Sequence, residues 1–114
     1  MERRSILVPH DFTTVADNAV SYAVILANSI KANVDLLHIV KDNKDKAKAK
    51  AKLEKIIANI KDKPQEVEVN FHIKSGSIYT DIASKASDLH STMIIMGTHG
   101  PKGMQRLFGS FAIK

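Results

Sequence analysis

Apolar and polar residues follow two different periods along this chain, and the two periods take turns. Three longer stretches repeat apolar residues at the spacing of a helix, and they cover residues 14–31, 45–60 and 77–89. Four shorter stretches are mostly apolar or strictly alternating, as strands are, and they cover residues 5–8, 34–40, 67–73 and 93–96. Strands separated by helices pair in parallel through right-handed crossovers. The pattern therefore predicts an α/β fold with a doubly wound parallel sheet.

The starts and inner faces of two helices can also be predicted. Thr14 is a candidate N-cap of the first helix, with Asp17 three residues later in the spacing of a capping box. Ser77 is a candidate cap of the third helix. The apolar spacing predicts an inner face for the first helix made of Ala16, Ala19, Val20, Ala23, Leu26, Ala27 and Ile30. For the third helix it predicts Ile78, Ile82, Ala83, Ala86 and Leu89.

The residue patterns of the last two predicted strands indicate different positions in the sheet. Residues 67–73 alternate strictly between apolar and polar, which predicts one solvent-facing side and a place at an edge. Residues 93–96 are four apolar residues in a row, which is typical of a strand covered on both faces.

The segment after this last apolar run carries most of the candidate chemistry. Gly97, Gly100 and Gly103 fall within seven residues, where the backbone can take positive φ and approach a ligand closely. Gly109 and Ser110 lie where a further helix could begin, and backbone N–H groups at a helix start attract phosphate. The spacing matches neither GxxxxGK[ST] nor GxGxxG. Two interpretations stay open, a phosphate loop or an ordinary turn followed by a serine cap.

Composition limits the function classes. A chain of 114 residues predicts one domain, 1–114, large enough for a core without disulfide or metal support. The absence of cysteine excludes disulfides, thiol nucleophiles and thiolate metal sites. His38, His72 and His90 show no metal-ligand spacing, and no GxSxG motif is present. We therefore expect no structural metal and no dedicated enzyme.

The net charge of +5 is concentrated in one segment. Residues 41–63 hold nine lysines and four acidic residues. A basic segment can bind nucleic acid. Leu53 and Ile56 at helical spacing, alanines between the lysines and the lack of aromatic residues favour a solvated face of an amphipathic helix instead. No stretch has the pattern of a signal peptide or a membrane span, which predicts a cytoplasmic protein without membrane partners.

The glycine segment resembles the signature of the universal stress protein family, G-x2-G-x9-G-[ST]. Gly97 and Gly100 match its first pair and Gly109-Ser110 its end, with eight rather than nine residues between Gly100 and Gly109. ILVPHDFT at 6–13 and LLHIV at 36–40 resemble the first two strands of the family. The resemblance covers nearly the whole chain. It implies a Rossmann-like, adenine nucleotide alpha hydrolase-like fold with strand order 3-2-1-4-5.

The family fold continues through another helix and a fifth strand, whereas this sequence ends at Lys114. We therefore expect strand order 3-2-1-4 and a domain that is incomplete at its C-terminus. An unpaired apolar strand edge is normally covered. The expected assembly is a homodimer or a tandem-domain protein.

The resemblance also implies an adenine-nucleotide site at the carboxyl ends of strands one and four. Asp11 would contact the adenosine, Ile39 would lie against the adenine, and Gly109 to Phe111 would offer backbone N–H groups to the phosphates. His99 would touch a phosphate, act as an acid or base, or point to solvent. The residues implied in nucleotide binding are Pro9, His10, Asp11, Ile39, Met96, Gly97, His99, Gly100, Gly109, Ser110 and Phe111.

The function implied by the resemblance is a stress-response regulatory module that binds ATP, with Mg²⁺ or Mn²⁺ brought by the triphosphate. One alternative is a scaffold of the same family that does not bind nucleotide and acts through dimerisation or protein contacts. Another is a slow ATPase or nucleotidyl transferase, which needs a general base or a residue that positions water. Nucleic acid is not an expected partner.

Overall fold

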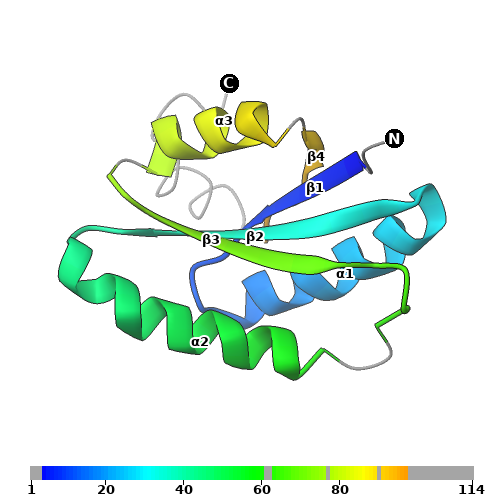
Figure 1. The fold of residues 1–114 in the computed structure, drawn as a ribbon, viewed down its shortest axis with the longest axis horizontal. Helices are drawn as coiled ribbons and strands as arrows, with labels where there is room; N and C mark the ends of the chain where they lie inside the picture. Colours follow the sequence, from blue (N-terminus) through cyan, green and yellow to red (C-terminus); the bar gives the residue numbers. More distant parts are fainter. Residues whose placement is uncertain (1–3, 61–62, 77, 90, 98–114) are drawn as a thin grey trace.

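The computed structural model describes residues 4–60, 63–76, 78–89 and 91–97, and its centre is a parallel sheet (Figure 1). The strands are β1 (Arg4–Pro9), β2 (Ala32–Val40), β3 (Val69–Ser75) and β4 (Ser91–Ile94). Their order in the sheet is β3-β2-β1-β4. This confirms the doubly wound α/β fold with order 3-2-1-4, the edge position of the third strand, and the pairing of the first strand with the fourth.

The helices lie on both faces of the sheet. On one face lie α1 (Thr14–Ile30) and α2 (Lys46–Ala58), with the short 3-10 helix η1 (Asn43–Asp45) before α2. On the other face lies α3 (Ile78–Asp88), as Figure 1 shows. Among the described residues, none of the helices combines the length and apolarity that spanning a membrane requires.

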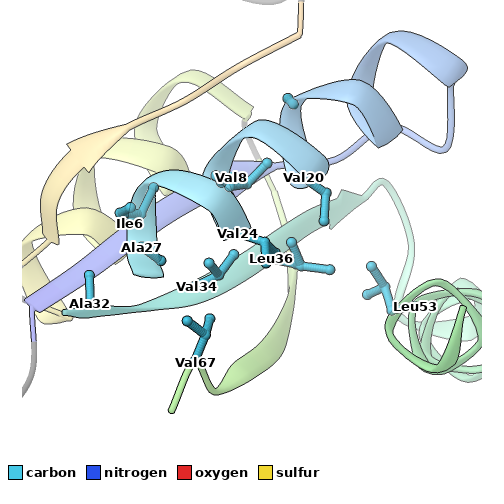
Figure 2. Close-up of a cluster of buried hydrophobic side chains, with 12 residues drawn as sticks. Ile6, Val8, Val20, Val24, Ala27, Ala32, Val34, Leu36, Leu53 and Val67 are labelled. Atoms are coloured by element: carbon cyan, nitrogen blue, oxygen red, sulfur yellow. The ribbon is translucent and has the colours of Figure 1, made fainter. Parts of the chain in front are cut away.

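The larger core fills the space between the sheet and the helices α1 and α2 (Figure 2). Small residues on α1 let this helix approach the sheet closely, and the buried ones include Ala16, Ala19, Ala23 and Ala27. Leu53 of α2 is fully buried, and burial of a leucine side chain contributes about 1.5–3 kcal/mol. All residues of the face predicted for α1 are buried or half-buried. All of them except Ala16 belong to this core or pack against it, and Val24 joins them.

The smaller core lies under α3 and consists of Leu7, Leu37 and Ile82 with partly buried neighbours. Ala86 and Leu89 pack against it as predicted. The placement of Ala83 on the inner face was wrong, because this residue is exposed. Ile82, the residue next to Ala83, is the buried contact of α3, and consecutive residues on a helix do not share a face.

The fourth strand differs from its prediction. It covers Ser91–Ile94 rather than residues 93–96, and its register with β1 shifts between Ser5 and Ile6. Its residues alternate between half-buried and exposed, and Ile94 is 42% exposed. Coverage of both faces was therefore a wrong prediction for this strand. Among the described residues β4 pairs only with β1, so it lacks the second neighbouring strand of a central strand.

The start of α1 is also corrected. Thr13, not Thr14, is the N-cap, and its hydroxyl accepts the N–H of Ala16 at 3.2 Å. The Asp11 carboxylate accepts both the N–H and the hydroxyl of Thr13 and so sets the cap residue in place. Asp17 makes no capping box, since its carboxylate accepts a hydrogen bond from His10 instead.

Other ends of helices and strands differ from the predicted ones by one or two residues, because these ends depend on contacts with neighbouring elements. The lysine-rich helix covers Lys46–Ala58, and the third strand covers Val69–Ser75. The third strand is half-buried almost throughout, so its polar side is less exposed than the alternation predicted. The cap predicted at Ser77 lies outside the described residues.

A line of polar side chains crosses the sheet on the α3 face. The buried Asp35 of β2 accepts hydrogen bonds from the Ser5 hydroxyl of β1 at 2.5 Å and from His72 Nε2 of β3 at 2.9 Å. Ser91 of β4 donates to the Ser5 hydroxyl at 3.4 Å. Burial alone would raise the pKa of Asp35, but the hydrogen bonds from His72 and Ser5 and the charge of His72 outweigh it and hold the pKa below its usual value.

The lowered pKa predicts how this line contributes to stability. A carboxyl whose pKa is lower in the folded state stabilises the fold when the pH is above the pKa of the unfolded state, here 3.8. This contribution is lost as the pH falls through the pKa of the folded state. Asp35→Asn should therefore lower the free energy of unfolding by about 1–3 kcal/mol near neutral pH. The difference from the wild type should be full well above pH 3.8 and should shrink as the pH falls below 3.8. Urea denaturation followed by circular dichroism measures both quantities.

The exposed Asp88→Asn serves as the matched control, since it removes the same charge at the end of α3. It should change the unfolding free energy by less than about 0.5 kcal/mol. A difference for Asp35→Asn that stays constant with pH would contradict the role given to this carboxylate.

Candidate functional site

A hollow opens at the carboxyl ends of β1 and β2, beside the segment that follows β4. We call it the switch-point hollow, and it is lined by Pro9, His10, Asp11, Leu37, His38, Ile39, Ile82, Met96 and Gly97. The chain leaves β1 toward α1 on one face of the sheet, and β4 returns from α3 on the other. In doubly wound sheets ligands bind at this reversal, because the loops diverge there.

His10 holds this end of the sheet together through four hydrogen bonds. Its N–H donates to the Leu37 carbonyl at 2.8 Å, and its carbonyl accepts from His38 Nδ1 at 2.7 Å. Its ring accepts the Phe12 N–H at Nδ1 and donates from Nε2 to Asp17, both at 2.9 Å. The buried ring therefore has both nitrogens satisfied within the protein. The hydrogen bonds join β1, β2 and the first turns of α1.

The loop between β1 and α1 turns sharply at Phe12. This residue has φ of 65°, which is rare for a bulky side chain and needs support from its surroundings. The hydrogen bond from its N–H to His10 and a ring contact with His38, 4.2 Å between centroids, supply that support. Asp11, just before it, is exposed at the rim of the hollow. One of its oxygens is used by Thr13.

Gly97 forms the opposite wall and lies against the start of α1. A Cβ atom at this position would sit 2.3 Å from the Val15 carbonyl oxygen, a distance at which backbone must move. The reason for glycine here is therefore close approach between the segment after β4 and the first turn of α1.

The floor of the hollow is apolar. Leu37, Ile39, Ile82 and Met96 come from β2, α3 and the segment after β4, and they belong to the smaller core. The enclosed cavity is about 50 Å³. It is smaller than the usual few hundred Å³ of ligand pockets, so it can enclose only part of a ligand.

The structure gathers six of the predicted site residues around this hollow, namely Pro9, His10, Asp11, Ile39, Met96 and Gly97. The other five, His99, Gly100, Gly109, Ser110 and Phe111, lie outside the described residues. Their proposed roles stay predictions. Within the described part of the chain, no three histidine or acidic side chains come together in a way that could hold a metal ion.

Sequence analysis missed His38 as a site residue. Its Nδ1 donates to the His10 carbonyl, so this nitrogen carries the hydrogen, and no other hydrogen bond of this ring is found among the described residues. The remaining nitrogen, Nε2, is left for a ligand or for water. The signal in the sequence was a single histidine inside the apolar strand end LLHIV. In the sequence alone, nothing distinguished His38 from His72 as a candidate site residue.

Comparisons with known proteins identify relatives. A model of the Universal stress protein family matches residues 2–114. Hypothetical protein MJ0577, the subject of a structure-based functional assignment, is 27% identical with a TM-score of 0.74, over 96% of this chain and 85% of that chain. A universal stress protein from Archaeoglobus fulgidus DSM 4304 is 29% identical with a TM-score of 0.65, over 82% of this chain and 33% of that chain.

A third solved structure, a universal stress protein in complex with cAMP, shares the fold. It is 14% identical with a TM-score of 0.65, over 96% of this chain and 85% of that chain. No match was found among curated proteins.

The contact of Gly97 with Val15 predicts that Gly97→Ala is destabilising. The added methyl group must displace the carbonyl of the first turn of α1, and such overpacking costs about 1–3 kcal/mol. Ser75→Thr, which adds one methyl group at the exposed end of β3, should change the unfolding free energy by less than about 0.5 kcal/mol. Urea denaturation compares the two variants. Equal stability of Gly97→Ala and the wild type would refute the contact.

The two ring hydrogen bonds of His10 predict a graded pair of variants. His10→Ala keeps the backbone hydrogen bonds to Leu37 and His38 but leaves the Phe12 N–H and the Asp17 carboxylate without the buried ring, and should cost about 3 kcal/mol of unfolding free energy. Asp17→Ala removes a single partner on the exposed side and should cost about 1 kcal/mol. Thermal and urea unfolding measure both. If Asp17→Ala costs as much as His10→Ala, the ring does not have the central role described.

Proposed function

This chain belongs to the universal stress protein family, whose members are stress-response proteins, and from that premise we propose that its switch-point hollow binds an adenine nucleotide, ATP, as a regulatory signal. The observation that carries the proposal is the position and lining of the hollow. It opens at the reversal of the sheet, where doubly wound folds bind nucleotides, and it combines an apolar floor with a carboxylate at its rim.

The lining supports a separate role for each part of the nucleotide. Ile39 and Met96 are half-buried and offer an apolar surface against which a planar base can pack. Asp11 has an exposed carboxylate that can accept hydrogen bonds from ribose hydroxyls. Gly97 contributes only backbone to the wall, because Val15 occupies the place where a Cβ atom would stand. The structure of a fold relative in complex with cAMP also supports an adenine nucleotide as the ligand class.

The phosphates would extend from the hollow toward the glycine-rich segment that begins at Gly97. The proposed contacts are the N–H groups of Gly109 to Phe111, with Gly100 giving the backbone freedom to turn and His99 close to the phosphate chain. Mg²⁺ or Mn²⁺ would arrive with the triphosphate, since both prefer phosphate and carboxylate oxygens. The cavity of about 50 Å³ fits a ligand that is only partly enclosed.

We propose binding rather than turnover. A general base must lie within hydrogen-bond reach of the proton it removes. Both ring nitrogens of His10 are already used within the fold, and Asp11 is tied to the turn before α1. Slow hydrolysis or nucleotidyl transfer remains the enzymatic alternative, with His99 or Asp11 as the group that positions water.

A scaffold function is the second candidate, and one surface observation favours it. A hollow of about 720 Å³ lies between α1 and α2, and its apolar lining includes Val20, Val24, Ile25 and Ile56. Ile25 is exposed, and exposed apolar patches often mark protein contacts. In this reading the domain acts as a homodimer or beside a tandem domain, without nucleotide.

Isothermal titration of the chain with ATP in the presence of Mg²⁺ tests the main proposal. We expect saturable binding, weakened at least about tenfold by Asp11→Ala, because the ribose loses its acceptor. Asp88→Ala removes an exposed carboxylate from α3 and should change the affinity by less than about twofold. Circular dichroism checks that each variant is folded.

Three outcomes separate the candidates. ATP binding that is unchanged by Asp11→Ala would overturn the assignment of the hollow. No binding of ATP, ADP or cAMP would sink the nucleotide proposal and favour the scaffold. Phosphate release during the titration, lost on His99→Ala, would favour the enzyme.

A further inference from the structure

A second hollow lies on the other face of the sheet, where β2 ends and α2 begins. We call it the lysine groove, and it is lined by Phe12, His38, Ile39, Val40, Lys41, Asp45, Lys48, Ala49 and Lys52. Its volume is about 290 Å³. It shares His38 and Ile39 with the switch-point hollow, so the end of β2 separates the two. The proposed nucleotide site does not account for it.

The groove carries an excess of positive charge. Lys41, Lys48 and Lys52 face one acidic residue, Asp45. Lys48 and Lys52 are four residues apart and so lie on one side of α2. Neither of the two ion pairs among the described residues includes a lysine. The three lysines therefore have no carboxylate partner in the described part of the chain.

The position of these charges on α2 is unfavourable for the helix itself. The first turn of α2 contains no acidic residue, and Asp45 makes no side-chain hydrogen bond as its cap. Lys46 and Lys48 lie at the end where the helix dipole is positive, which costs a few tenths of a kcal/mol or more per charge. A bound anion would reverse this penalty, because it would satisfy both the lysines and the dipole.

One wall of the groove is held rigidly. The rings of Phe12 and His38 lie 4.2 Å apart between centroids, and Lys52 Nζ lies 4.9 Å above the Phe12 ring centroid. This cation–π contact positions the ammonium group over the groove. The hydrogen bond from His38 Nδ1 to the His10 carbonyl fixes the other ring and leaves its Nε2 as the remaining polar atom. Two polar groups of the lining are therefore placed before any ligand arrives.

From this arrangement we propose that the lysine groove is a second, separate anion site that binds a chain of phosphate groups. Lysine ammonium groups bind phosphate oxygens through charge-assisted hydrogen bonds. Phe12 already contacts the His38 ring and the Lys52 ammonium group. Three lysines against one aspartate make the lining suited to phosphate groups. This site is independent of the nucleotide proposed for the switch-point hollow.

The two sources of such a ligand are a free polyphosphate and the phosphate tail of a nucleotide. The probe is inorganic tripolyphosphate without metal, titrated into the full chain by calorimetry and by amide NMR. We expect saturable binding with the largest shifts at Phe12, His38, Lys48 and Lys52. ATP, measured in the same way on Asp11→Ala, shows whether a nucleotide tail also enters the groove.

Two double variants with the same charge change locate the site. Lys48→Gln with Lys52→Gln should weaken tripolyphosphate binding at least about tenfold. Lys50→Gln with Lys55→Gln removes two charges from the same helix outside the groove lining and should weaken it less than about threefold. Glutamine keeps a high helix propensity, so both proteins should fold equally well.

A third variant should act in the opposite direction. Asp45→Asn removes the acidic residue of the lining and should tighten tripolyphosphate binding about threefold or more. A variant that merely damaged the fold would not tighten binding. The proposal is overturned if the two double variants weaken binding equally, if Asp45→Asn has no effect, or if the shifts centre on Asp11 and Gly97. Binding of single-stranded RNA without binding of tripolyphosphate would overturn it in favour of a nucleic-acid surface.

The experiment separates this inference from the proposed function. Loss of ATP binding on Asp11→Ala with tripolyphosphate binding intact supports two sites. Tripolyphosphate binding that Asp11→Ala abolishes, with the variant still folded, would show a single site and refute the separate groove.

Discussion

The hydrogen bonds of His10 are the constraint on which this end of the molecule depends. A strand that ends in a parallel sheet has polar backbone groups that must find partners when they are buried. His10 gives its own N–H and carbonyl to β2 and its two ring nitrogens to the following loop and to α1. One residue therefore ties the end of β1 to β2, to the loop and to α1, and its ring supports the positive φ of Phe12.

That geometry also creates the two hollows. The loop carries Asp11 to the rim of the switch-point hollow and Phe12 to the wall of the lysine groove. His38, near the end of β2, lines both hollows, and its hydrogen bond to the His10 carbonyl holds it there. The close approach of Gly97 to Val15 then closes the first hollow on the side of β4. A ligand in either hollow would therefore contact the end of β2 and the loop before α1, which the hydrogen bonds of His10 join.

The architecture was predictable because it depends on local periods. Short apolar runs alternating with helical stripes gave the parallel sheet, and the alternation of residues 67–73 gave the edge position of β3. The failures share a cause. Ala83 and Ile94 have the right residue type for a core, but whether they are buried depends on which elements cover them. Thr13 rather than Thr14 is the N-cap, and the Asp11 carboxylate holds Thr13 in place. The spacing of residues in the sequence does not reveal this loop geometry.

The sequence by itself determined the elements, the order of the strands through its family resemblance, and six residues that gather at one end of the sheet. Only the tertiary structure decided the partners of the polar residues. Ser5, Asp35 and His72 lie on three strands and meet across the sheet, and His38 meets His10 over a separation of 28 residues. The physical reason is that a helical or strand period is a property of neighbouring residues, whereas hydrogen bonds and charge clusters between elements depend on register and packing across the whole fold.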